Sequence, residues 1–379
     1  MTAPDLDLAG HDRSMTLGVF AENQLQQLGD VVGLAPSDTK AYASVLAESL
    51  GSAAQRPLNL PPPSRSFLSD DHTPIEFSLS CRPGETPSLR LLFEPGCAAD
   101  NLVDNGRTGW RVLHTLAGRW GFGVRQLDLI EDLFLPTAPQ GSLALWLAME
   151  LRPGGVPRLK VYLNPAASGA HTAGATVHEA LRRLGYEQGL SALPSSDGYP
   201  FFALDLGDWA APRAKVYLRH ENLTAAGASR LSRMPDGPRP AVLEDFFRTV
   251  GGFGRAPSEE SRADRLPALT CHSFTETATG LPSGFTLHMP VRAYVRHDGE
   301  AHERAVAVFE QQDIDVTPLT RALSAVTPRR LEDGAGLIAY LALAHEQGQA
   351  PRVTAYISSE AYTAHPTIPL RPTQAATSS

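Results

Sequence analysis

Cysteine is scarce in this sequence, and its histidines are scattered. The 379 residues include three cysteines, Cys81, Cys97 and Cys271, with neither a CxxC pair nor a metal-ligand spacing. A small, odd number of cysteines is typical of a protein in a reducing compartment, so we expect a cytoplasmic protein without a disulfide framework. The twelve histidines form no HxH or HxxxH pair, and no metal site is therefore expected.

Long apolar runs and an excess of basic residues are missing as well. No stretch of about 18 apolar residues suggests a membrane span, and the acidic N-terminus lacks the apolar run of a signal peptide. Asp and Glu number 41 against 33 Lys and Arg, which gives a formal net charge of -8. This balance argues against a general nucleic-acid or anionic-membrane surface, so clustered Arg and Lys indicate a local site.

The sequence does contain a repeated strand pattern in which a cation precedes a tyrosine by two residues. In residues 213–220, a period of two places Arg213, Lys215 and Tyr217 on one face and apolar residues on the other. Related segments are 89–95 with Arg90, 158–164 with Lys160 and Tyr162, 291–297 with Arg292 and Tyr294, and 352–357 with Thr354 and Tyr356. If these faces converge in a closed sheet, they form a ring of cations beside a ring of phenols. Such a lumen suits an anion attached to a group that prefers an aromatic wall.

The expected elements follow a β-β-α rhythm that recurs about five times. We predict helices at about 15–34, 38–50, 102–120, 173–185, 223–232 and 240–251, and a mainly helical region at 317–347. Strands are predicted at 73–80, 89–95, 143–151, 158–164, 201–206, 213–219, 291–297 and 352–358, with 283–289 leading into the strand at 291–297. The rhythm differs from the strict alternation of a parallel barrel. It favours an α+β fold, an antiparallel barrel of about ten strands with helices outside.

No change of composition divides the chain into two folding units. A length of 379 residues is compatible with two or three domains, but barrels often reach such lengths as one domain. We therefore predict a single barrel domain at residues 13–365, with a flexible leader at 1–12 and a flexible tail at 366–379, which is rich in Thr, Pro and Ser.

Taken together, these segments resemble a known enzyme family. The order and spacing of Thr73-Pro74-Ile75-Glu76, residues 89–95 and the later cation and tyrosine strands are similar to an aromatic prenyltransferase of the dimethylallyltryptophan synthase type, in its bacterial branch. The resemblance implies the αββα barrel and transfer of a dimethylallyl group from dimethylallyl diphosphate to the indole ring of L-tryptophan, with the 6-position favoured. It also implies no metal, no cofactor, no nucleic-acid or membrane partner, and a monomer or weak homodimer.

The same resemblance assigns roles to particular residues. Glu76 matches the acidic residue that holds the indole N–H. The diphosphate-binding cations match Arg90, Lys160, Arg213, Lys215 and Arg292, where Arg292 replaces a glutamine common in fungal members. The tyrosine shield of the allylic cation matches Tyr162, Tyr217, Tyr294 and Tyr356. Some fungal members place a lysine base on the strand before Lys160, but residues 143–151 contain no lysine, which leaves the final proton acceptor and the ring position open.

These residue types suit the implied chemistry. Ionisation of the donor leaves a diphosphate anion, which Arg and Lys stabilise, and an allylic cation, which tyrosine faces stabilise and shield from water. A carboxylate at Glu76 can accept the indole N–H while positive charge develops on the ring. The chain has no DDxxD sequence of the kind that binds diphosphate through magnesium, and Asp70-Asp71 lacks the third acid.

Two alternatives remain open at the level of the sequence. The acceptor can be another aromatic compound, such as a tryptophan-containing peptide, a phenol or a naphthol, because only Glu76 favours an indole. Cations interleaved with aromatics also occur in proteins that bind single-stranded nucleic acid, although the net charge of -8 argues against that function.

Overall fold

Side chains alternate along the strands of the central sheet, and this alternation positions everything in the lumen. In β1 (Ile75–Cys81), the apolar Ile75, Phe77 and Leu79 belong to the hydrophobic core outside the sheet, whereas Glu76 lines the cavity inside it. A period of two produces this division wherever a strand carries apolar residues at every second position. One face of the sheet therefore packs against helices, and the other face carries polar and aromatic side chains.

The sheet closes into a barrel in the computed structural model, which describes residues 15–207, 213–254, 262–277 and 279–362. Ten strands of the described part form the barrel, and each pairs antiparallel with both neighbours. Around the barrel they are β1, β12 (Arg352–Ser358), β11 (Ile338–Glu346), β10 (Gly284–Met289), β9 (Ala268–Phe274), β6 (Ala214–His220), β5 (Phe202–Leu206), β4 (Arg158–Leu163), β3 (Leu145–Glu150) and β2 (Ser88–Phe93). The predicted fold class is confirmed.

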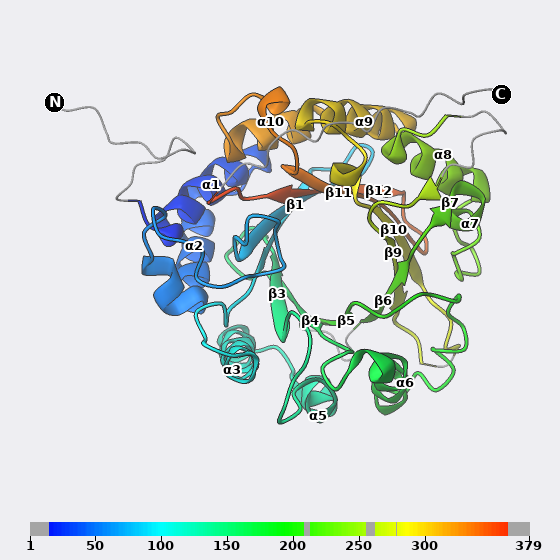
Figure 1. Cartoon of the computed structure of the whole chain (residues 1–379), viewed down its shortest axis with the longest axis horizontal. Helices are drawn as coiled ribbons and strands as arrows, with labels where there is room; N and C mark the ends of the chain where they lie inside the picture. The colour runs from blue at the N-terminus through cyan, green and yellow to red at the C-terminus, as the bar shows by residue number, and fades with distance from the viewer. Residues whose placement is uncertain (1–14, 208–212, 255–261, 278, 363–379) are drawn as a thin grey trace, which may run out of the picture.

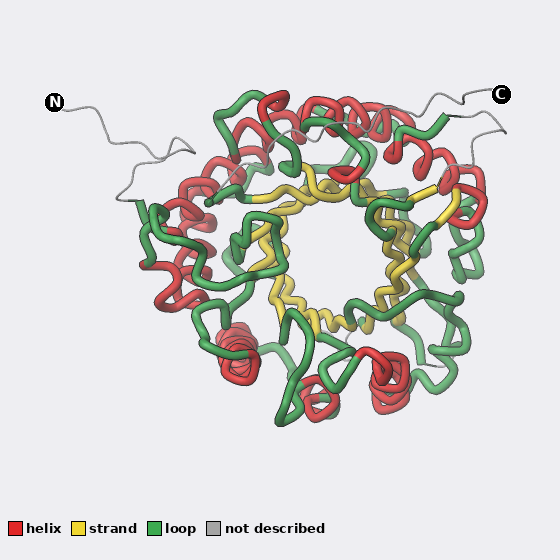
Figure 2. The backbone as a smooth tube through the Cα atoms, viewed as in Figure 1, coloured by secondary structure: helices red, strands yellow, loops and turns green. Residues whose placement is uncertain are grey.

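Helices surround this barrel on its outer side, as the views along its axis show (Figure 1, Figure 2). The longer ones are α1 (Leu17–Val31), α2 (Pro36–Leu50), α3 (Leu102–Trp120), α6 (Ala173–Arg183), α8 (Pro240–Gly251), α9 (Asp298–Gln311) and α10 (Thr317–Val326). Single turns are α4 (Arg125–Asp128), α5 (Glu131–Phe134) and α7 (Ala225–Ala228), with 3-10 turns η1 (Gly51–Gln55), η2 (Ala170–Thr172), η3 (Val291–Ala293) and η4 (Leu331–Asp333). A separate pair of two-residue strands, β7 (Leu223–Thr224) and β8 (Arg262–Ala263), lies outside the barrel sheet.

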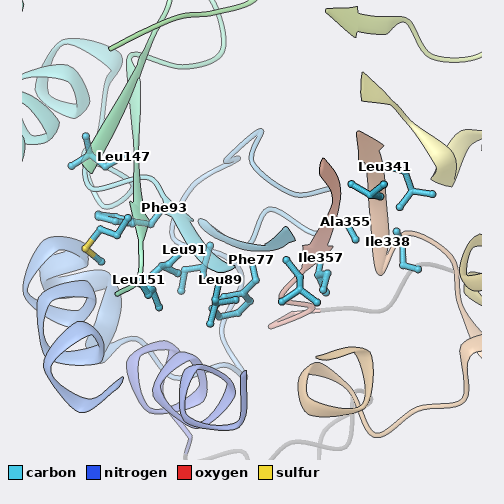
Figure 3. Packing of buried hydrophobic residues seen from close by; sticks show 14 of the residues in the cluster. Phe77, Leu89, Leu91, Phe93, Leu147, Leu151, Ile338, Leu341, Ala355 and Ile357 are labelled. Carbon is cyan, nitrogen blue, oxygen red and sulfur yellow. The ribbon is translucent and has the colours of Figure 1, made fainter. Parts of the chain in front are cut away.

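The hydrophobic core fills the layer between the barrel and its helices. Phe77, Leu91 and Ile357 come from three adjacent strands and are fully buried in one cluster, which Figure 3 shows beside the helices. Burying a side chain of this size contributes about 1.5–3 kcal/mol. Because the core lies outside the barrel, the lumen need not be filled with apolar side chains to stabilise the fold.

The predicted strand at 291–297 is wrong. Pro290 lacks a backbone N–H and ends β10, so residues 291–293 form the turn η3. His297 then caps α9 by accepting a hydrogen bond from the Glu300 backbone N–H. The strand that completes the barrel beside β6 is instead β9, at residues 268–274, which the sequence reasoning did not identify.

The helical region predicted at 317–347 is correct only in its first part. Helix α10 ends at Val326, and residues 338–346 form β11, between β10 and β12. The alanines of β11, such as Ala342 and Ala344, have a high intrinsic helix propensity. In the barrel, however, both neighbouring strands provide hydrogen-bond partners, and this pairing overrides local propensity.

The predicted leader at 1–12 and tail at 366–379 lie outside the described residues. Among the helices of the described part, none is both long and apolar enough to cross a membrane.

Candidate active site

The lumen contains a charged chamber toward one end of the barrel. Its side chains come from inward positions of several strands, and its opening has a volume of about 520 Å³. Two of the three lysines in the chain lie here, Lys215 buried and Lys160 with a side chain that is 12 % exposed. In total, seven cationic side chains meet four carboxylates, namely Arg82, Arg90, Arg158, Lys160, Arg213, Lys215 and Arg352 with Glu85, Glu150, Asp205 and Glu346. Cationic side chains therefore outnumber carboxylates in the empty chamber.

Asp205 organises the lysine side of the charged chamber. It lies opposite Lys160 in the pairing of β4 with β5, and its carboxylate is 3.6 Å from the Lys160 Nζ, 3.2 Å from the Lys215 Nζ and 2.7 Å from the Arg213 Nε. Burial disfavours its charge, but these three cations hold the pKa of Asp205 well below its usual range. Asp205 is therefore a shared counterion that keeps three cations close together.

The other side of the charged chamber has the same construction. Arg90 pairs with Glu150 at 2.9 Å, and both Arg213 and Arg352 pair with Glu346, at 3.2 and 3.6 Å. Despite burial, the neighbouring arginines lower the pKa of Glu150 and of Glu346 to about 2. The buried Arg352 Nε has no hydrogen-bond partner within the described part of the chain. An anion that enters the chamber can therefore bind to cationic side chains and to at least one N–H group without a hydrogen-bond partner, that of Arg352 Nε.

Burial lowers the pKa of Lys215 well below its usual range, although the negative charge of Asp205 opposes this shift. Lys160 behaves differently, because Tyr162 and Asp205 outweigh the effect of burial and raise its pKa. A second anion beside Lys215 would restore its positive charge, so the empty chamber favours the binding of a multiply charged anion.

An aromatic chamber of about 150 Å³ adjoins the charged one. The rings of Tyr162 and Tyr217 lie 5.7 Å apart, and Phe201 packs edge-on against both, at 6.0 and 5.7 Å. Further walls come from Leu68, Leu92, Trp146, Tyr340 and Tyr356. Tyr217, Tyr356 and His288 line both chambers, so they mark the boundary where a molecule in one meets a molecule in the other.

Glu76 is the buried carboxylate of the aromatic chamber. It lies on β1 between Leu92 and Ser358 of the neighbouring strands and is 7 % exposed. Burial raises the pKa of Glu76 to about 8, partly opposed by the positive charge of Arg292 and reinforced by Asp70. In this environment, a hydrogen-bond donor or a positive charge nearby stabilises the ionised form of the carboxyl group.

Arg292 lies in the aromatic chamber and not with the other predicted diphosphate ligands. Its Nε is 2.7 Å from the Asp70 carboxylate, and its guanidinium stacks 4.9 Å from the centroid of the Tyr340 ring. The reason is the turn η3, which follows β10 at the end of the barrel where Glu76 lies. The cation that joins Arg90, Lys160, Arg213 and Lys215 is Arg352.

Tyr294 lies outside both chambers. Its hydroxyl donates to the Leu266 carbonyl at 3.1 Å and accepts from the Arg265 N–H at 3.2 Å, while its ring packs against Phe253. Because residues 291–297 are not a strand, the alternation that was expected to direct Tyr294 inward does not apply there. On β10 itself, the corresponding inward residue is His288.

Sequence reasoning missed other members of the site, although their signals were present. Arg158 precedes Lys160 by two residues and Arg352 precedes Thr354 by two, so a period of two places them on the same faces. The carboxylates Glu150, Asp205 and Glu346 were missed because a sequence does not show which strands are neighbours. The pairing of β4 with β5 brings Asp205 to Lys160 across 45 residues of sequence.

A loop at residues 66–73 covers part of the aromatic chamber, and buried hydrogen bonds hold it in place. The Ser66 hydroxyl donates to Glu94 at 2.6 Å, and the Asn105 side-chain amide donates to the same carboxylate at 2.7 Å. Asp71 accepts hydrogen bonds from Ser69 and Thr73, at 2.6 and 2.7 Å. These bonds position the loop residues that line the chamber, which include Leu68 and Asp70.

Comparison with known proteins identifies the family of this chain. A family model for tryptophan dimethylallyltransferase matches residues 39–318. The chain belongs to the tryptophan dimethylallyltransferase family. The resemblance inferred from the sequence is thereby confirmed, and with it the assignment to the prenyltransferase enzymes.

Several solved structures of tryptophan dimethylallyltransferases and related enzymes are similar over nearly the whole chain. Prenyltransferase PriB is 60% identical, covers 93% of this chain and 98% of its own, and has a TM-score of 0.90. It has also been solved with L-tryptophan and dimethylallyl thiolodiphosphate. The 5-dimethylallyl tryptophan synthase from Streptomyces coelicolor is 57% identical, with 95% and 100% of the two chains covered and a TM-score of 0.89. The 6-dimethylallyltryptophan synthase from Micromonospora olivasterospora is 36% identical, with 93% and 99% covered and a TM-score of 0.84.

Proposed function

We propose that this protein transfers a dimethylallyl group from dimethylallyl diphosphate to the indole ring of L-tryptophan in the cytoplasm. The observation that supports this most is the division of one lumen into two adjoining chambers. In one chamber, cationic side chains outnumber carboxylates, and the other has aromatic walls and the buried carboxylate of Glu76. The three cysteines are free and buried, which suits a reducing compartment.

The donor binds with its diphosphate in the charged chamber, on Arg90, Lys160, Arg213, Lys215 and Arg352. The allylic C–O bond breaks, its electron pair leaves with the diphosphate, and the cations stabilise the growing negative charge. The allylic cation then lies at the boundary, against Tyr162, Tyr217 and Tyr356, whose ring faces stabilise positive charge and exclude water.

The acceptor binds in the aromatic chamber. Glu76 accepts the indole N–H, and its negative charge stabilises the positive charge that the ring gains as it attacks the allylic cation. Arg292 and Asp70 form a pair of opposite charges beside Glu76, which matches the carboxylate and ammonium groups of a free amino acid. This pair favours free tryptophan over a tryptophan-containing peptide or a phenol.

One incubation tests the reaction and its position on the ring. Purified protein, L-tryptophan and dimethylallyl diphosphate should yield a monoprenylated tryptophan, which NMR of the product identifies. We propose the 6-position, and the 5-position is the alternative because relatives named for both positions are similar to this chain. If correctly folded protein yields no prenylated tryptophan, the proposed function is contradicted.

Turnover should persist in EDTA. Seven cations surround the proposed diphosphate site, and no group of three or more His, Cys, Asp or Glu in the described part is arranged to hold a metal. Initial rates are measured without EDTA, with EDTA, and with EDTA followed by excess magnesium, to test whether turnover depends on a metal. Loss of activity in EDTA that magnesium restores would contradict the diphosphate site.

Lys215→Gln should lower kcat/KM for the donor more than about tenfold, because a charge-assisted contact is worth about 1.5–3 kcal/mol. Arg219→Gln is the matched control on the same strand. Its guanidinium is 45 % exposed and bonds to the Asp197 carbonyl and to Glu221 at the rim, so we expect little change. Steady-state kinetics of both variants compare them, and equal losses would mean that the diphosphate lies elsewhere along the barrel.

Arg292→Gln should raise KM for L-tryptophan about tenfold or more, because it removes a charged contact to the α-carboxylate. Tryptamine has the same indole ring but no carboxylate, so its KM should change much less. Kinetics with both acceptors measure the difference. A similar loss for both acceptors would show that Arg292 acts through Glu76 or the chamber wall and not on the carboxylate.

A further inference from the structure

His288 lies at the boundary between the two chambers, where the new carbon–carbon bond would form. It projects from β10 into the lumen, and its ring centroid is 5.8 Å from that of Tyr217 and 5.7 Å from that of Tyr356. It lines the aromatic chamber together with Glu76 and the charged chamber together with Lys160.

The imidazole of His288 is neutral and has few competing partners. Its Nε2 lies 3.2 Å from the Tyr356 hydroxyl, and its ring also interacts with the backbone of Leu269, its partner on β9. Burial, reinforced by the positive charge of Lys160, lowers the pKa of His288 to about 3, while the backbone of Leu269 acts in the opposite direction. A neutral imidazole carries one nitrogen lone pair and can accept a proton.

Other titratable groups that line the aromatic chamber are less suited to accept a proton from a ring carbon. Glu76 is engaged with the indole N–H in the proposed function, and Asp70 is paired with Arg292. The phenol of Tyr217 has a pKa raised by burial, so it stays protonated. The carboxylates of the charged chamber are held by arginine and lysine, as Asp205 is.

We propose that His288 is the base that completes the reaction by accepting the proton from the prenylated ring carbon. This role rests on the proposed function. After the indole has used an electron pair to form the bond to the allylic carbon, the ring is cationic. The ring C–H bond then breaks, its electron pair restores aromaticity, and the proton passes to the imidazole of His288. The resulting imidazolium releases its proton to solvent when the products leave.

Donor binding strengthens this base. In the empty site, the positive charges of Lys160, Lys215 and Arg352 oppose protonation of His288. Diphosphate in the charged chamber neutralises these cations and adds negative charge close to the imidazole, which favours the imidazolium. His288 therefore becomes an effective proton acceptor only when the donor, or the diphosphate released from it, is in place.

The test compares wild-type protein with His288→Gln, using L-tryptophan and L-tryptophan deuterated on the indole ring. We expect the variant to lose about a hundredfold in kcat, a typical contribution of a general base. Its isotope effect on kcat should rise above that of the wild type, because proton removal becomes rate-limiting. His288→Phe, which keeps an aromatic ring at the boundary, should show the same increase, and added imidazole should partly restore the rate of His288→Ala.

His272→Gln is the matched control, since His272 is also fully buried but belongs to the outward face of β9, against Phe285. It should keep the wild-type isotope effect. If both His288→Gln and His288→Phe turn over at nearly the wild-type rate with an unchanged isotope effect, the proton passes to diphosphate or water and the role of His288 is overturned. Failure of the wild type to prenylate tryptophan would instead overturn the proposed function, and this role with it.

Discussion

Replacing Glu76 by glutamine is expected to lower the rate of prenyl transfer to tryptophan by about ten- to a thousandfold, which corresponds to about 1.4–4 kcal/mol of transition-state stabilisation. Glutamine keeps the size and one acceptor oxygen of the side chain but removes the negative charge that opposes the positive charge of the ring. Donor affinity should hardly change, because Glu76 lines the aromatic chamber and not the charged one.

Calorimetry with a non-reactive donor analogue measures donor affinity, and single-turnover kinetics measure the rate of prenyl transfer. A Glu76→Gln protein with normal turnover would show that the carboxylate is structural and that the indole binds elsewhere. A large loss of donor affinity would show that the two chambers do not act separately.

The pH dependence of kcat/KM for tryptophan gives an independent check on Glu76. Because the pKa of Glu76 is raised to about 8, the carboxyl group is mostly protonated below that pH and ionised above it. The ionised form is the one that stabilises the ring cation, so kcat/KM should rise as the pH increases through about 8. In Glu76→Gln this rise should be absent. In Arg292→Gln it should shift to higher pH, because Arg292 opposes the raised pKa.

Asp205→Asn is expected to destabilise the empty protein strongly, by about 3–5 kcal/mol in the free energy of unfolding. The substitution leaves Lys160, Arg213 and Lys215 close together without their shared counterion, at a carboxylate that is 6 % exposed. Inorganic diphosphate should recover much of the lost stability, because it brings negative charge to the same three cations. It should also raise the melting temperature of the variant more than that of the wild type.

Thermal and urea unfolding, each with and without diphosphate, measure the melting temperature and the free energy of unfolding. Asp132→Asn is the matched control, because its carboxylate pairs with Arg183 on the surface and is 66% exposed. Surface pairs contribute about 0–1 kcal/mol, so this variant should behave like the wild type. An Asp205→Asn protein as stable as the wild type, with no added response to diphosphate, would mean that Asp205 does not hold the cations together.

The confirmed expectations share one property: they depend on the local pattern of the chain. Helices α3 and α8 were predicted with their observed bounds, because their apolar residues recur at helical spacing over several turns. The strands that carry Lys160 and Lys215 were predicted from their alternation. The period of two along these strands also predicts that the two lysine side chains point into the barrel.

The wrong expectations arose where local pattern and tertiary structure disagree. The segment 291–297 repeats the cation and tyrosine spacing, but Pro290 and the cap at His297 convert it into a turn and the start of a helix. Arg292 therefore lies in the aromatic chamber with Glu76, and Tyr294 lies outside both chambers and packs against Phe253. The segment 338–346 has the alanines of a helix, but two neighbouring strands make it a strand.

The sequence by itself determined the barrel class and the chemical types of the site, namely clustered cations, tyrosines and one acid, and its resemblance to known prenyltransferases indicated the family. The barrel class and the chemical types follow from residue identity and from periods of two and 3.6, which are local properties of the chain. Only the tertiary structure decided which side chains share a chamber. The register of β4 with β5 brings Asp205 to the lysines, β12 adds Arg352, and β10 places His288 at the boundary. Contacts of this kind depend on strand order and register around a closed sheet, and no local pattern encodes them.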